Sequence, residues 1–93
     1  MENQHRKISG YRELSQAEID LMNEIKAFGP QLEALVQKVF EHVNAQHQDA
    51  FGNTEEVNRM KAASPTRWAD IGRNDLQTGL MALTRAIAQP TFF

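Results

Sequence analysis

The sequence predicts an all-α protein, an antiparallel helical hairpin with a kinked first long helix and a short N-terminal arm. Three observations support this fold class. Apolar residues recur at spacings of three and four along two long segments, a helix-start signal precedes each segment, and nowhere do apolar and polar residues alternate as in a half-buried strand. The chain has 93 residues, too few for a second hydrophobic core. We therefore expect residues 1–93 to form one domain, with residues 1–14 as the arm.

The first long helix is expected over residues 15–46. Ser15 can accept a hydrogen bond from the third amide of the helix while Glu18 reaches back to the Ser15 amide, an arrangement called a capping box. Helical spacing then places one apolar stripe on one face, formed by Leu21, Ile25, Phe28, Leu32, Leu35, Val39 and Val43.

This stripe stays in phase across Gly29 and Pro30, although proline is unfavourable inside a helix. Two separate helices would have no reason to stay in phase, so we expect one helix kinked near Gly29-Pro30. Because Pro30 cannot donate to the carbonyl of Lys26, the kink would gather a free carbonyl and an ammonium in one turn. The alternative is a helix break with a short loop.

Residues 47–63 form the expected connector. Phe51-Gly52-Asn53 indicates a turn, and Thr54-Glu55-Glu56 indicates the cap and acidic first turn of a short helix with Val57 and Met60 facing inward.

The second long helix is expected over residues 64–89, with Ser64 as its N-cap and Pro65 in its first turn. Its apolar positions again follow helical spacing: Trp68, Ile71, Leu76, Leu80, Leu83 and Ile87. We expect Trp68 and Met81 to belong to the core. Residues 90–93 form a tail.

Two helices side by side are expected to leave much apolar surface uncovered, because each is several turns long and has only one neighbour. The tail adds Phe92 and Phe93 at a terminus. Association with further copies of the chain is the simplest cover for this surface, and it predicts a homo-oligomer. The alternative for the two rings is that they fold back over their own hairpin.

Composition excludes several classes of function. The formal net charge is −2 and no block of Lys or Arg occurs, which argues against binding a DNA or RNA polymer. The chain has no cysteine, so disulfides and thiolate metal sites are excluded. The polar N-terminus contains neither a signal peptide nor a membrane span. We expect a cytoplasmic protein that does not enter a membrane.

No catalytic or metal constellation stands out. His42 and His47 are five residues apart and lie off a common helical face, and His5 is in the arm. The sequence contains no P-loop, no glycine-rich dinucleotide motif and no nucleophile elbow. We therefore expect neither an enzyme nor a bound metal or cofactor.

Candidate binding residues are easier to identify. Tyr11 follows Gly10 and precedes Arg12, so a purine could stack on its ring beside a guanidinium, although the ring could instead cover the hairpin. Lys26 lies near the apolar stripe, where its ammonium could meet a phosphate or simply extend into solvent. Arg67 follows Ser64-Pro65-Thr66 at a helix start, which favours anions.

Two blocks of the sequence carry a family resemblance: HRKISGYRELS at residues 5–15, and Arg67-Trp68 with DLQTGLMALTRAIAQP at residues 75–90. Both resemble the phage anti-CBASS sponge family, whose hairpin domain is shared with a phage anti-Thoeris sponge. The similarity covers nearly the whole chain and is weakest over residues 44–63.

The resemblance implies a homohexamer that sequesters cyclic oligonucleotides made by host defence enzymes and breaks no bond in them. It implies that Tyr11 and Lys26 hold cyclic dinucleotides of the cyclic GMP-AMP type between protomers. Arg67 would contribute to separate pockets for cyclic trinucleotides of the cyclic tri-adenylate type. Phe28 departs from the family, which carries a hydroxyl residue near the trinucleotide pocket at this place. A phenyl ring cannot supply that hydrogen bond, so dinucleotide binding is the firmer expectation.

The residues leave two other functions open. A structural or adaptor protein docking on a larger phage or host assembly would show no affinity for small molecules. A hydrolase of cyclic nucleotides would release linear product, but it would need a metal or base constellation that the sequence lacks.

Overall fold

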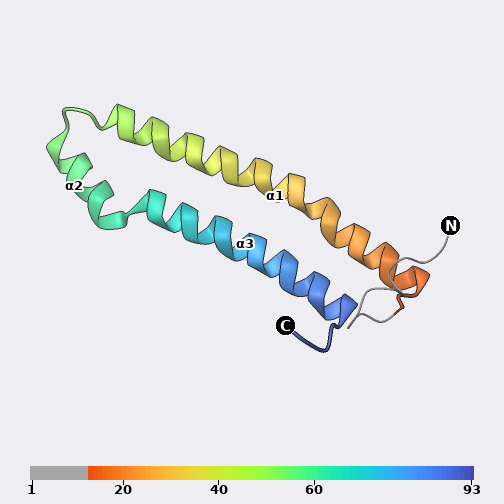
Figure 1. The fold of residues 1–93 in the computed structure, drawn as a ribbon. Helices are drawn as coiled ribbons and strands as arrows, with labels where there is room; N and C mark the ends of the chain where they lie inside the picture. Colours follow the sequence, from red (N-terminus) through yellow and green to blue (C-terminus); the bar gives the residue numbers. More distant parts are fainter. Residues whose placement is uncertain (1–12) are drawn as a thin grey trace.

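The computed structural model describes residues 13–93 and is a hairpin of two long antiparallel helices (Figure 1). Helix α1 spans Gln16–Asp49, the short helix α2 spans Thr54–Ala63, and α3 spans Pro65–Ala88. Helices α1 and α3 pack side by side, and α2 closes one end of the pair. The described residues contain no strand. The predicted all-α hairpin is confirmed.

The two ends of the hairpin differ. The elbow end comprises residues 43–71, where the chain turns through α2. The open end comprises residues 16–29 and 77–93, where α1 begins and α3 ends (Figure 1).

Helix α1 begins with the predicted capping box. The Glu18 amide donates to the Ser15 hydroxyl at 3.2 Å, and the Ser15 amide donates to the Glu18 carboxylate at 2.8 Å. The helix continues through Pro30, so the alternative of a break at this point is wrong. Since Pro30 has no N–H, the carbonyl of Lys26 lacks its usual helical donor. The kink itself stays a prediction.

The start of α2 lies one residue earlier than the sequence suggested. Asn53, not Thr54, is the N-cap, and its side-chain oxygen accepts a hydrogen bond from the Glu56 amide at 3.1 Å. Asparagine caps a helix at least as well as threonine, and Gly52 supplies the preceding turn with a φ of 85°. Helix α1 also runs past residue 46 to Asp49, which shortens the turn before α2.

Ser64 ends α2 and begins α3 in one left-handed residue, with a φ of 51°. Pro65 occupies the first turn of α3 as predicted. Ser64 is the N-cap of α3, as predicted, but it makes no side-chain cap hydrogen bond, because its hydroxyl donates instead to the carbonyl of Lys61 at 3.1 Å. The hydroxyl therefore satisfies a carbonyl in the last turn of α2.

Burial is confined to the elbow end. Val43, Ala50 and Met60 are the buried hydrophobic residues of the described chain, and Met60 is only 3% exposed. The inward position predicted for Met60 is confirmed. No hydrophobic residue of the open end reaches this degree of burial among those the structure describes.

The single apolar stripe predicted for α1 divides into two. Between residues 22 and 43, the half-buried or buried positions form the seam facing α3; they are Met22, Ile25, Gly29, Leu32, Val36, Phe40 and Val43. The other stripe, called the apolar flank, is exposed and consists of Leu21, Phe28, Leu35 and Val39. At about 100° per residue the two stripes are adjacent on the helix, and a single neighbouring helix covers only one of them.

Two further core predictions are wrong for the same reason. Trp68 is 58% exposed and Met81 is 71% exposed. The described molecule measures 63 × 24 × 16 Å, and its radius of gyration is 20.1 Å, against about 12 Å for a compact chain of this length. A rod of this shape cannot enclose side chains on all sides of its helices. No helix of the described residues is both long and apolar enough to cross a membrane.

Candidate ligand-binding groove

The groove between α1 and α3 contains two neighbouring cavities. The cavity at the open end, called the Lys26 groove, has a volume of about 860 Å³ and is lined by Met22, Asn23, Ile25, Lys26, Gly29, Gln77, Leu80, Met81, Thr84, Arg85, Ala88 and Pro90. The cavity in the middle of the hairpin, called the Arg73 groove, has a volume of about 650 Å³ and is lined by Gly29, Pro30, Leu32, Glu33, Val36, Gln37, Phe40, Asp70, Arg73, Leu76, Gln77 and Leu80.

The Lys26 groove is suited to an anion. Lys26 enters it from α1 and Arg85 from α3, and both side chains are exposed. Among residues 13–93, no Asp or Glu lines it. Aliphatic side chains, Asn23 and Gln77 supply the rest, while the Thr84 hydroxyl donates to the Leu80 carbonyl at 3.0 Å. The described lining therefore combines two cations with apolar walls.

The C-terminal tail ends beside the Lys26 groove. Gln89 has a φ of 53° and turns the chain back from α3 (Figure 1), and Pro90 lines the groove. One terminal nitrogen of Arg85 donates to the carbonyl of Phe92 at 2.7 Å. The tail thus returns to its own protomer through its backbone. The alternative that both rings lie over the hairpin is wrong, because Phe93 is fully exposed.

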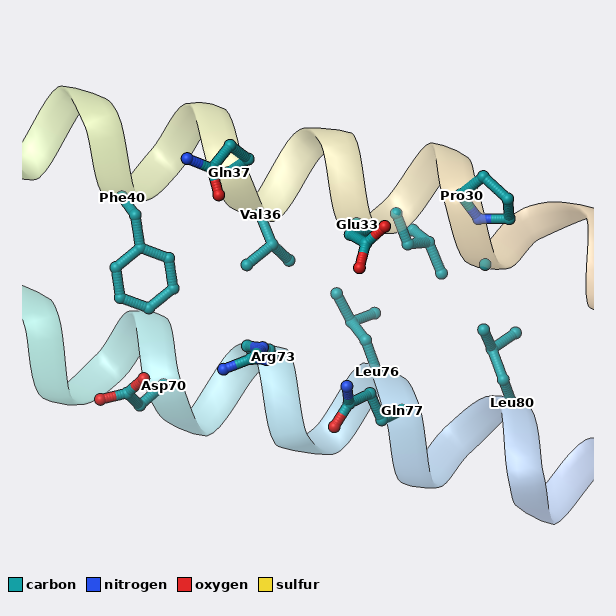
Figure 2. A pocket seen from close by; sticks show the side chains of 12 residues that line it. Pro30, Glu33, Val36, Gln37, Phe40, Asp70, Arg73, Leu76, Gln77 and Leu80 are labelled. Atoms are coloured by element: carbon teal, nitrogen blue, oxygen red, sulfur yellow. The ribbon is translucent and has the colours of Figure 1, made fainter.

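The Arg73 groove has the opposite charge balance. Glu33, Asp70 and Arg73 line it, which leaves one negative charge in excess. Figure 2 shows Phe40 and Val36 pointing from α1 toward α3, with Leu76 and Leu80 pointing the other way. This cavity is a poor site for a doubly charged anion.

The sequence-predicted site residues are separated along the rod. Lys26 lies in the Lys26 groove, whereas Arg67 lies in the first turn of α3 at the elbow end. Arg67 is 13 residues before Leu80, which is about 20 Å along a helix. One protomer therefore does not bring Lys26 and Arg67 into one site. Gly10, Tyr11 and Arg12 lie outside the described residues.

Arg67 does have an aromatic neighbour. Its guanidinium carbon lies 5.0 Å from the centroid of the Trp68 ring, within the range of a cation–π contact. Both side chains are exposed, so together they present a flat cationic surface at the elbow end.

Sequence reasoning missed Arg85 as a site residue. Its place opposite Lys26 depends on which turn of α3 faces which turn of α1, and helical periodicity does not contain that register. Only the way in which the two helices pair would have identified it.

The described residues contain no group of three or more His, Cys, Asp and Glu side chains that could hold a metal ion.

Comparison with known proteins adds to this geometry. The sequence model of the Acb2/Tad1 hairpin domain matches residues 5–88. The chain is also similar to a protein of Pseudomonas phage JBD67 named Anti-CBASS protein 2, with 45% identity over 105 aligned positions that cover 97% of each chain.

Proposed function

Since the chain belongs to the Acb2/Tad1 hairpin-domain family, we propose that it is an anti-CBASS protein that sequesters cyclic oligonucleotide signals without altering them. The proposal rests mainly on the composition of the Lys26 groove. A cyclic dinucleotide presents two phosphodiesters and two bases, so it requires cations and apolar surfaces close together. The groove offers both, and its volume of about 860 Å³ falls within the range of small-molecule sites.

In this proposal Lys26 binds a phosphate and Tyr11 stacks on a base, with Gly10 and Arg12 beside the ring. Arg67 serves a separate site for cyclic trinucleotides, which fits its distance from Lys26 along the hairpin. Phe28 weakens that second site because a phenyl ring donates no hydrogen bond. Sequestration requires affinity and a slow off-rate rather than catalysis, and it would take place in the cytosol of the infected host cell.

Self-association is part of the same proposal. The apolar flank is exposed along α1 and needs a cover, which further copies of the chain would supply in a homo-oligomer, a hexamer by family resemblance. Leu35→Glu places a charge on this flank and should lower the mass measured by light scattering. Ala45→Glu adds the same charge at an exposed position outside the flank and should leave the mass unchanged. Equal masses for wild type and Leu35→Glu would contradict the proposed interface.

Calorimetric titration with cyclic GMP-AMP tests the ligand. We expect tight binding by the wild type, and chromatography should recover the ligand unchanged. Tyr11→Ala should weaken binding by about 1–3 kcal/mol, the range for one lost base–aromatic stack. Lys26→Ala should weaken it more at low salt than at high salt, because ions screen an exposed contact.

Lys38→Ala is the matched control, since Lys38 is an exposed lysine of the same helix and lines neither cavity. Absence of heat with every cyclic di- and trinucleotide would overturn the proposal. The apolar flank would then favour an adaptor that docks on a larger assembly. Linear product in the chromatogram would indicate a hydrolase instead.

A further inference from the structure

We propose that Arg85 is a second phosphate-binding residue of the Lys26 groove, and that the C-terminal tail occupies this guanidinium until a ligand displaces it. The inference rests on the proposed function and deepens it. It assigns a role to a side chain and a segment that the family resemblance left without one.

The first step of the argument is the position of the two cations. Lys26 from α1 and Arg85 from α3 line one cavity, so a phosphate that enters this groove can meet both positive charges. A cyclic dinucleotide carries its two phosphodiesters on opposite sides of its ring. Each of the two protomers that hold it would supply one Lys26 and one Arg85, so each phosphodiester can meet a pair of cations.

The second step is the charge that Arg85 retains. Within residues 13–93 it makes no ion pair, and its hydrogen bond goes to the neutral carbonyl of Phe92. A guanidinium carries five N–H donors, so this bond leaves most of them available. The exposed side chain therefore keeps both its positive charge and its capacity for a forked contact with a phosphate.

The third step concerns the tail. A hydrogen bond from a guanidinium to a phosphate is roughly twice as strong as one between neutral groups, and it can be bidentate. A phosphate arriving in the groove should therefore replace the Phe92 carbonyl on Arg85. Pro90 lines the groove and Gln89 turns the chain back, so the last residues are held beside the entering ligand. Ligand and tail would compete for one side chain.

Calorimetric titration of the full chain with cyclic GMP-AMP tests Arg85. Arg85→Ala should raise the Kd about tenfold to hundredfold, the loss expected for a hydrogen bond to a charged group. Arg85→Lys should give an intermediate value, because it keeps the charge and loses the fork. The slope of log Kd against log salt concentration should fall in Arg85→Ala, which a purely structural role would not produce.

Arg73→Ala is the matched control, since Arg73 is an exposed arginine of the same helix that lines the other cavity. Its Kd should stay within about twofold of wild type. No binding by the wild type would overturn the proposed function itself. Binding by the wild type with equal Kd values for Arg85→Ala and Arg73→Ala would overturn the role of Arg85 alone.

Release of the tail is measured separately on the wild-type chain. Carboxypeptidase A removes C-terminal aromatic residues, and saturating cyclic GMP-AMP should accelerate the release of Phe93 and Phe92. In Arg85→Ala the release should already be fast and should not respond to the ligand. Release from the wild type that is unchanged or slowed by the ligand would overturn the competition between tail and phosphate.

Discussion

The elbow end and the open end of the hairpin differ in burial and in the cavities that they carry. The elbow end holds all three buried hydrophobic residues of the described chain, and neither cavity of the groove is centred there. The open end buries no hydrophobic side chain fully, yet it carries Lys26, Arg85 and the larger cavity. Packing that stabilises the hairpin is thus concentrated away from the surface that we propose binds ligand.

The cause of this difference is the number of elements at each end. At the elbow end α2 lies across the end of the α1–α3 pair (Figure 1), and Met60 of α2 is buried there. At the open end two helices lie side by side, and a side chain between them still faces solvent on its flanks. The open end therefore offers space that a ligand or another copy of the chain can fill.

The largest effect on stability is expected when a methionine at each end is replaced by alanine. Met60→Ala should lower the free energy of unfolding by about 2–5 kcal/mol, because it removes a buried side chain and leaves a cavity. Met81→Ala removes the same atoms at an exposed position and should change it by less than about 0.5 kcal/mol. Urea denaturation at one fixed protein concentration measures both values.

An equal loss of stability in the two variants would break the comparison. It would mean that a second copy of the chain buries Met81 as deeply as the hairpin buries Met60. The dependence of the Met81→Ala value on protein concentration would then identify that contact.

A smaller effect is expected from the two helix caps. Ser15→Ala removes the cap of α1 at the open end, and Asn53→Ala removes the cap of α2 at the elbow end. Each should cost about 1 kcal/mol, the usual value for such a cap. Hydrogen exchange should show local fraying of the first turn of α1 in Ser15→Ala, but faster exchange across both long helices in Asn53→Ala. Identical exchange patterns would show that the two ends unfold as one unit.

The caps also show how much of the fold local sequence contains. Ser15 and Glu18 are three residues apart, and their mutual hydrogen bonds follow from that spacing alone. Pro65 marks the start of α3 for an equally local reason. The helices and their approximate bounds were therefore predictable without knowledge of their packing.

The contacts between helices were not predictable in the same way. Leu35 and Leu32 follow the same apolar spacing, but only the seam position Leu32 is half-buried. Which stripe becomes the seam depends on how α2 orients α3, and this is a property of the whole chain. The same register places Arg85 opposite Lys26. Local sequence patterns identified Lys26 as a candidate, but Arg85 could be identified only from the structure. The role of Tyr11 stays a prediction from sequence.

The smallest expected effect concerns the aromatic residue in the elbow turn. Phe51 is 91% exposed, although its neighbour Ala50 is buried. Phe51→Ser should change the free energy of unfolding by less than about 0.5 kcal/mol, because a ring that contacts little loses little when it is removed. Denaturation monitored by circular dichroism measures this value. A loss of about 1 kcal/mol or more, the cost of uncovering a packed ring edge, would mean that another molecule covers Phe51. The elbow end would then be a docking surface as well as the stabilising part of the hairpin.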